Sequence, residues 1–111
     1  MNKIIAIDQS TSSTKAMLFD EQCKMLARCN VDHKQYYPQA GWVEHDAEEI
    51  YDNMVEAIRK LIDHSSDMPT NVQYSLAITN QRETVVVWNK MTGKPVSNAI
   101  VWQDTRGKDI C

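Results

Sequence analysis

Three short segments of β type lie very close together at the start of the sequence. Residues 3–7, 14–20 and 23–32 are each apolar or loosely alternating, and turn-forming residues separate them. The connections are too short for the crossover that parallel strands need, so the three segments must pair as antiparallel hairpins. This constraint predicts an antiparallel sheet in the first third of the chain.

A helix is expected next, after a polar loop at residues 33–45. Asp46 and Glu49 have the spacing of a capping box, with Asp in the position usual for Ser or Thr. We expect a helix over residues 47–64 that buries an apolar stripe on the sheet, made of Ile50, Met54, Ile58, Leu61 and Ile62. The residues expected to end this helix are Ser65, Ser66, Asp67 and Pro69.

Strands are expected again after the helix, at residues 72–79, 84–90 and 98–102, with a turn at residues 92–95. A strand, a helix and a further strand form a crossover, which joins parallel strands. The sequence therefore predicts an α/β fold with a mixed sheet and a flanking helix. Residues 103–111 look like the opening of another helix, so we expect the chain to be the first part of a longer protein.

Composition excludes several classes of protein. The chain has 111 residues and a net charge of −3, with no basic stripe, which argues against a nucleic-acid or membrane surface. No apolar run approaches the roughly 20 residues that span a bilayer, and no secretory signal is present. The three cysteines fit no zinc spacing and indicate reduced thiols in a cytoplasmic protein, and no ligand spacing links the three histidines.

The first turn carries chemistry that suits phosphate groups. Asp8 ends the first strand, where a carboxylate can hold Mg²⁺, usually through water. Residues 10–14 all bear hydroxyls, which together with the turn amides can converge on an anion, and Lys15 adds a positive charge. The alternative is an ordinary solvated turn, rich in Ser and Thr because these residues bond the local backbone. The glycines of a Walker loop or a dinucleotide fingerprint are absent.

Two further clusters suit a small polyol. Arg82 and Glu83 follow a predicted strand, and together they can donate to and accept from neighbouring hydroxyls. Trp102 can cover a carbon backbone, with Gln103 and Asp104 beside it to take hydroxyls. A surface ion pair and core packing are the alternatives. All three clusters lie at strand ends, where open α/β sheets place ligands.

The motifs that carry these clusters resemble those of a known family. "IDQSTSSTKAMLFD" resembles the first phosphate loop of the FGGY carbohydrate kinases. The segments "GWVEHD", "ITNQRET", "W-x-K-x-TGKP" and "NAIVWQDTR" resemble the glycerol kinases within that family. The motifs follow the family's order and spacing over nearly the whole chain, so together they are highly specific.

The resemblance implies a ribonuclease-H-like, actin-like fold of two domains, with ATP bound between them. Residues 1–111 would be the first part of the amino-terminal domain of a cytoplasmic enzyme, which we expect to form a homo-oligomer. The implied reaction is phosphorylation of glycerol to glycerol 3-phosphate with ATP and Mg²⁺. The family's catalytic base and adenine pocket would lie beyond residue 111, so the chain alone is expected to be inactive. The residues that match the family's binding motifs are Thr11, Ser12, Ser13 and Lys15 for phosphates, Asp8 for magnesium, and Arg82, Glu83 and Trp102 for glycerol.

Two positions depart from the family's pattern and keep other substrates open. Ser10 replaces a usual glycine, and Lys15 replaces the arginine usual in glycerol kinases, which loses a bidentate fork. Both changes resemble other sugar kinases of the family, such as xylulose kinases. A non-catalytic interaction module is a second alternative. A nuclease is a third, but it needs several carboxylates at a two-metal site, and only Glu83 and Asp104 are available to partner Asp8.

Overall fold

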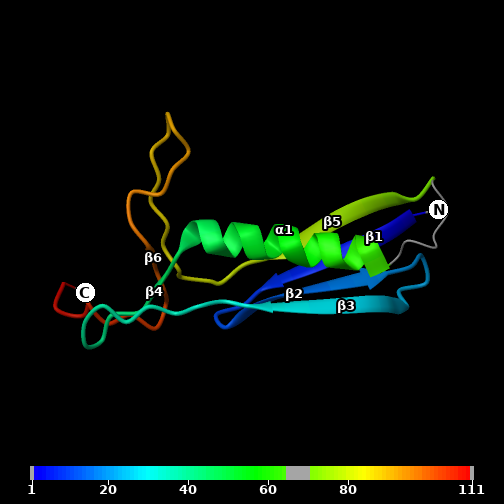
Figure 1. The fold of residues 1–111 in the computed structure, drawn as a ribbon. Coiled ribbons are helices and arrows are strands. Elements are labelled where there is room, and N and C mark those ends of the chain that lie inside the picture. The colour runs from blue at the N-terminus through cyan, green and yellow to red at the C-terminus, as the bar shows by residue number, and fades with distance from the viewer. Residues whose placement is uncertain (1, 65–70, 111) are drawn as a thin grey trace.

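The computed structural model describes residues 2–64 and 71–110. Its elements form a sheet with one helix across it and a smaller sheet beyond one end (Figure 1). In chain order they are β1 (Asn2–Gln9), β2 (Ser13–Phe19), β3 (Met25–Asp32), β4 (Glu44–His45), α1 (Ala47–His64), β5 (Gln73–Thr79) and β6 (Ala99–Ile100).

The main sheet has the strand order β3-β2-β1-β5. The pairs β1–β2 and β2–β3 are antiparallel, as the short connections predicted, and α1 provides the crossover that makes β5 parallel to β1. The prediction of a mixed sheet is confirmed. The register aligns Asp8 with Thr79, so the carboxyl ends of β1 and β5 lie at the same edge of the sheet.

The core lies between α1 and one face of the main sheet (Figure 1). Alternate residues of β1 and β2 meet the apolar stripe of the helix, as the two periodicities require. The buried cluster consists of Ile5, Ile7, Ala16, Leu18, Ala57 and Leu61. The expectation that Ile62 completes the stripe is wrong, because its side chain is 42% exposed and Ala57 is buried instead. Ile62 follows buried Leu61 directly, which turns it about 100° away around the helix.

Only one half of the predicted capping box, the bonds accepted by Asp46, is present at the start of α1. Asp46 Oδ1 accepts the backbone N–H groups of Glu48 at 3.0 Å and Glu49 at 3.4 Å. The Glu49 side chain does not complete a capping box but accepts the N–H of Lys34 at 3.2 Å, which ties the preceding loop to the helix. The predicted stop signals all lie at residues 65–70, outside the described residues.

The predicted strand at residues 84–90 is wrong. This segment makes only single bridges, from Val85 to Ile100 and from Trp88 to Pro95, and forms one side of a projecting arm (Figure 1). Its apolar side chains lack a continuous neighbouring strand among the described residues, so the pattern produces no ladder. The return strand, predicted at 98–102, is limited to β6, which pairs with β4.

The helix predicted to open at residue 103 is also wrong for residues 103–110, which form no helix and have turns at 103 and 106–110. Asp104 Oδ1 accepts the backbone N–H of Arg106 at 2.8 Å, and Asp104 Oδ2 accepts the N–H of Val43 at 2.7 Å. A side chain that bonds the local backbone in this way competes with helix formation.

The molecule is elongated because the small sheet and the arm extend beyond the main sheet (Figure 1). Its radius of gyration is 16.8 Å, against about 13 Å for a compact domain of this size. Within the described residues, α1 is too polar to cross a membrane, and no other helix is present that could do so.

Candidate functional site

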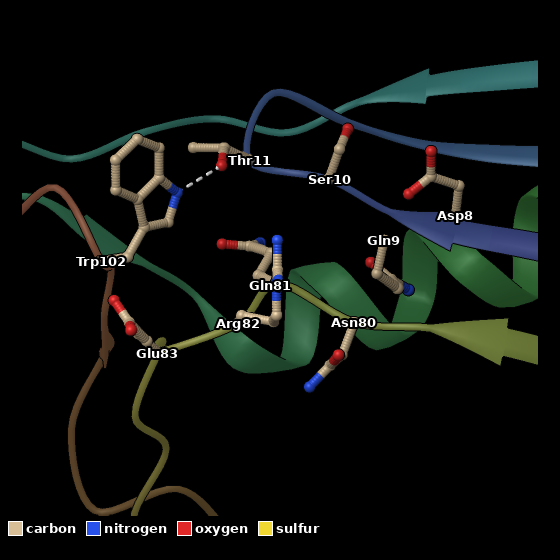
Figure 2. A pocket seen from close by; sticks show the side chains of 9 residues that line it. All are labelled: Asp8, Gln9, Ser10, Thr11, Asn80, Gln81, Arg82, Glu83 and Trp102. Atoms are coloured by element: carbon tan, nitrogen blue, oxygen red, sulfur yellow. Dashed lines mark hydrogen bonds between the residues drawn. The ribbon is translucent and has the colours of Figure 1, made fainter.

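A pocket of about 550 Å³ lies at the edge where β1 and β5 end. Three separate parts of the chain form it, and Figure 2 shows their side chains gathered around one space. The lining residues are Asp8, Gln9, Ser10, Thr11, Asn80, Gln81, Arg82, Glu83 and Trp102.

The sheet topology explains why these distant segments meet. Parallel pairing of β1 and β5 places Asp8 beside Thr79, and the Thr79 hydroxyl donates to Asp8 Oδ1 at 3.3 Å. The segments that follow the two strands therefore face each other across the edge of the sheet, as ligand-binding segments do in open α/β sheets. Five of the eight predicted site residues line the pocket, namely Asp8, Thr11, Arg82, Glu83 and Trp102.

The hydroxyl-rich turn is held by its own backbone. The Ser10 N–H and hydroxyl both donate to the Ser13 carbonyl, at 3.0 and 2.8 Å, and the His33 N–H donates to the Ser12 carbonyl at 2.8 Å. These bonds fix the turn, so Ser10 and Thr11 reach the pocket without a glycine.

The other hydroxyls of the turn do not all face the same space. Ser12 is exposed, Ser13 is buried, and neither side chain lines the pocket. The expectation that hydroxyls 10–14 converge is wrong for Thr14, which is fully buried toward the helix, because side chains alternate along β2. Lys15 pairs with Asp8 in the register, which places both side chains on the same face of the sheet.

Glu83 has an unusual backbone conformation. Its φ is 65°, in the left-handed region that residues other than glycine seldom adopt. Such strained residues gather at ligand-binding and catalytic sites, where the surrounding structure holds them. Glu83 and Arg82 both line the pocket, with Glu83 near the end occupied by Trp102 (Figure 2).

Trp102 connects the third segment to the turn. Its Nε1–H donates to the Thr11 hydroxyl oxygen at 2.8 Å (Figure 2). The Thr11 hydroxyl keeps its own proton free to donate to a ligand. A single hydrogen bond thus joins the residue expected to bind phosphate to the residue expected to cover a polyol.

Asp104 has a structural role, although its position in the sequence had suggested a contact with a polyol. It forms a close pair with Arg106, whose guanidinium also binds Glu44 Oε2 at 2.7 Å. Hydrogen bonds from Arg106 hold the pKa of the Asp104 carboxyl well below its usual range, and bonds to Asp104 and Glu44 raise the pKa of Arg106. Asp104 therefore anchors the loop before β4, and neither it nor Gln103 lines the pocket.

Several lining residues were missed by sequence reasoning. Gln9, Asn80 and Gln81 lie directly beside predicted site residues, so their position after strands was the available signal. Behind the pocket, His33 bonds Thr14 and His45 bonds Gln81. No spacing in the sequence indicated that these two histidines approach each other.

The carboxylates of the pocket suit a magnesium ion that arrives with phosphate groups. Within residues 2–64 and 71–110, no group of three or more His, Cys, Asp or Glu side chains could hold a metal. Mg²⁺ commonly takes one or two protein carboxylates and completes its shell with phosphate oxygens and water. Asp8, oriented by Thr79 and beside a hydroxyl-rich turn, fits that donor set.

Comparison with known proteins gives consistent matches over the chain. Residues 3–111 match the profile of the FGGY family of carbohydrate kinases, N-terminal domain. The chain is 56% identical over 108 residues to glycerol kinase 1 of Thermotoga maritima, which covers 97% of this chain and 22% of that protein.

Solved structures agree in fold. The crystal structure of Plasmodium falciparum glycerol kinase with ADP matches with a TM-score of 0.92 and 44% identity, over 99% of this chain and 22% of that one. A ligand-bound xylulose kinase from Lactobacillus acidophilus matches with a TM-score of 0.86 over 99% of this chain and 21% of that one, and its 23% identity shows the fold alone. The chain spans about a fifth of the length of these proteins.

Proposed function

Because the chain belongs to the FGGY family of carbohydrate kinases, we propose that the protein containing it transfers the γ-phosphoryl group of ATP to glycerol, giving glycerol 3-phosphate. The observation that carries this proposal is the single pocket that gathers Asp8, the hydroxyl-rich turn, the Arg82–Glu83 pair and Trp102. The chain would be the first part of the amino-terminal domain. The catalytic base and the adenine pocket would come from the rest of the protein.

The turn after β1 would bind the phosphates. Thr11 lines the pocket and can donate its hydroxyl proton, and the turn amides, Ser12, Ser13 and Lys15 would complete this side when a nucleotide binds. Asp8 would hold Mg²⁺, and the bound ion would neutralise negative charge on the phosphates. Donors that the fold holds in place in advance stabilise the charge that spreads over the transferred group.

The segment after β5 would bind the polyol. The Arg82 guanidinium can donate to hydroxyl oxygens, and the Glu83 carboxylate can accept from hydroxyl protons. Trp102 would place its apolar ring against the carbon chain. Phosphoryl transfer depends mainly on such positioning and on charge stabilisation, so these three side chains would set the geometry of attack.

The proposal includes a cytoplasmic, homo-oligomeric enzyme. Free thiols at Cys23 and Cys29 suit a reducing compartment. Half-exposed apolar side chains on β5, Leu76 and Ile78, suit contacts with further protein.

A coupled ADP-release assay on the full-length protein tests the substrate. Glycerol, xylulose, ribulose and erythritol are offered side by side with ATP and Mg²⁺. Activity confined to glycerol supports the proposal. Activity on a ketose alone would contradict it and would give more weight to Ser10 and Lys15, which resemble other sugar kinases. Steady glycerol 3-phosphate formation by the 111-residue chain alone would contradict the proposal that the base lies elsewhere.

Replacing Arg82 tests the polyol side of the pocket. We expect Arg82→Ala to raise the KM for glycerol by about 10- to 100-fold, the loss expected for hydrogen bonds from a charged donor. The KM for ATP should change little, because Arg82 follows β5 and the phosphate turn follows β1. Lys90→Ala is the matched control, since it removes an exposed cation from the arm. An equal loss of affinity for both substrates would indicate a folding defect instead.

A further inference from the structure

Two histidines lie together behind the pocket, away from its lining. His45 is fully buried, His33 is half-buried, and their ring centroids are 5.9 Å apart with the planes tilted by 49°. His33 follows β3, and His45 belongs to β4 just before α1. The pair therefore lies where the main sheet, the helix and the small sheet meet.

The His33 ring is part of a chain of hydrogen bonds that runs from α1 toward the phosphate turn. The Asn53 amide donates to His33 Nδ1 at 2.9 Å, so a neutral His33 ring carries its proton on Nε2. That nitrogen lies 3.0 Å from the Thr14 hydroxyl, which in turn donates to Gln9 Oε1 at 3.0 Å. The chain from helix to pocket wall thus has one consistent direction.

His33 also holds the turn through its backbone. Its N–H donates to the Ser12 carbonyl at 2.8 Å, within the segment that carries Thr11 into the pocket. Backbone and ring of one residue thereby fix two points of the same turn.

The second ring reaches the opposite wall. The Gln81 amide donates to His45 Nδ1 at 3.2 Å, and Gln81 Oε1 accepts the Thr84 hydroxyl at 3.1 Å. Both the amide nitrogen and the amide oxygen of Gln81 are thus hydrogen-bonded, directly before Arg82 and the strained Glu83. Among the described residues, the buried His45 Nε2 has no hydrogen-bond partner.

Both rings are suited to the neutral form that these bonds require. Burial lowers the pKa of His33 against the opposing charges of Glu49 and Asp32. Burial, and then the neighbouring His33, lower the pKa of His45 against Glu49. A neutral ring can accept at Nδ1 from an amide, which a protonated ring cannot.

We propose that His33 and His45 are a pair of positioning residues, with His33 setting the phosphate turn through Thr14 and Ser12, and His45 setting the polyol-binding segment through Gln81. The roles of the phosphate turn and of the polyol-binding segment rest on the proposed function above. Because the rings pack against each other, the pair also links the placement of one wall to the placement of the other.

Kinetics of the full-length protein test the polyol side. We expect His45→Leu to raise the KM for the polyol about tenfold, as the loss of one anchoring hydrogen bond implies, with less than about a threefold change in the KM for ATP. His45→Asn offers Oδ1 as an acceptor in place of Nδ1 and should recover most of the loss. An unchanged polyol KM in His45→Leu, or no recovery with His45→Asn, would overturn the proposal.

Thr84→Val keeps the test decisive if His45→Leu does not fold. The substitution has nearly the same shape and removes only the other tether of Gln81. It should raise the polyol KM in the same direction, and an unchanged KM would overturn the role of Gln81. In the same way, His33→Leu should raise mainly the KM for ATP, and a rise confined to the polyol would overturn the assignment of walls.

A measurement without turnover separates this inference from the proposed function. ¹⁵N NMR of the histidine-labelled full-length protein reports the tautomer of each ring. We expect both rings to be neutral with the proton on Nε2 at neutral pH, and a proton on Nδ1 of either ring would overturn the hydrogen-bond directions. If no polyol is phosphorylated, the proposed function fails while the tautomers still decide whether the relays exist.

Discussion

Glu83 holds a conformation that its own chemistry disfavours. A φ of 65° costs a residue with a Cβ roughly 1–2 kcal/mol. The bridge from Val85 to Ile100 restrains the backbone after Glu83, and the hydrogen bond between the side chains of Thr84 and Gln81 spans it. The fold accepts this strain at the point where a carboxylate enters the pocket, which is the usual place for it.

Two substitutions separate the strain from the chemistry of this side chain. We expect Glu83→Asn to raise the free energy of unfolding by about 0.5–1 kcal/mol, because Asn adopts the left-handed region more readily. The same variant should bind the polyol more weakly. Glu83→Gln keeps the length and the strain, so it should lose affinity without gaining stability. Urea unfolding and the polyol KM check both, and equal stabilities of the two variants would contradict the strain argument.

The sequence predicted those pocket residues whose positions depend only on the end of a single strand. Asp8, Arg82 and Trp102 were identified because they lie at or shortly after the ends of predicted strands, where open α/β sheets place ligands, and all three line the pocket. His33 and His45 could not be found in this way. Their approach depends on how β3, β4 and α1 pack, and a lone histidine carries no periodic signal of that packing.

At the scale of elements, local sequence signals correctly predicted the helix, whose formation depends on local hydrogen bonds. The helix was predicted over 47–64 and observed at Ala47–His64, because an N-cap and an apolar period of 3.6 are both local. The predictions of a strand at 84–90 and of a helix opening at residue 103 were wrong, because the structure of both segments depends on partners far along the chain. Val85 is bridged to Ile100, and Asp104 to Val43.

The cap of α1 gives a prediction for this element. We expect Asp46→Ala to lower the free energy of unfolding by about 1 kcal/mol, since it removes the acceptor for the N–H groups of Glu48 and Glu49. Asp52→Ala is the matched control, because it removes an exposed carboxylate from the middle of the same helix. Denaturant unfolding measures both. A control that loses as much stability as Asp46→Ala would contradict the capping argument.

At the scale of the molecule, the two histidines make stability depend on pH. The folded pKa of each lies below the unfolded value of 6.5, so the unfolded state takes up protons first as the solution is acidified. The contribution of the two histidines to the free energy of unfolding should therefore be fully present above about pH 6.5. It should fall as the pH drops toward their folded pKa values. Asp104 contributes a separate loss, below its unfolded pKa of 3.8.

Unfolding at a series of pH values measures this dependence. The double variant His33→Gln, His45→Asn should show a flatter profile between pH 8 and pH 5 while retaining the steep loss at lower pH. An identical slope in the wild type and the double variant would assign the titration to groups other than these two histidines.

The isolated chain should associate with itself through β5. This strand has no partner on its outer edge among the described residues, and its Leu76 and Ile78 are 52% and 51% exposed. An unpaired edge beside apolar side chains is a template for pairing with another copy. We expect the apparent mass in sedimentation velocity to rise with concentration, and Leu76→Lys to suppress the rise. Met91→Lys, at a 90% exposed position on the arm, is the matched control and should leave it unchanged. If the control suppresses association as strongly as Leu76→Lys, the arm rather than the open edge of the sheet makes the contact.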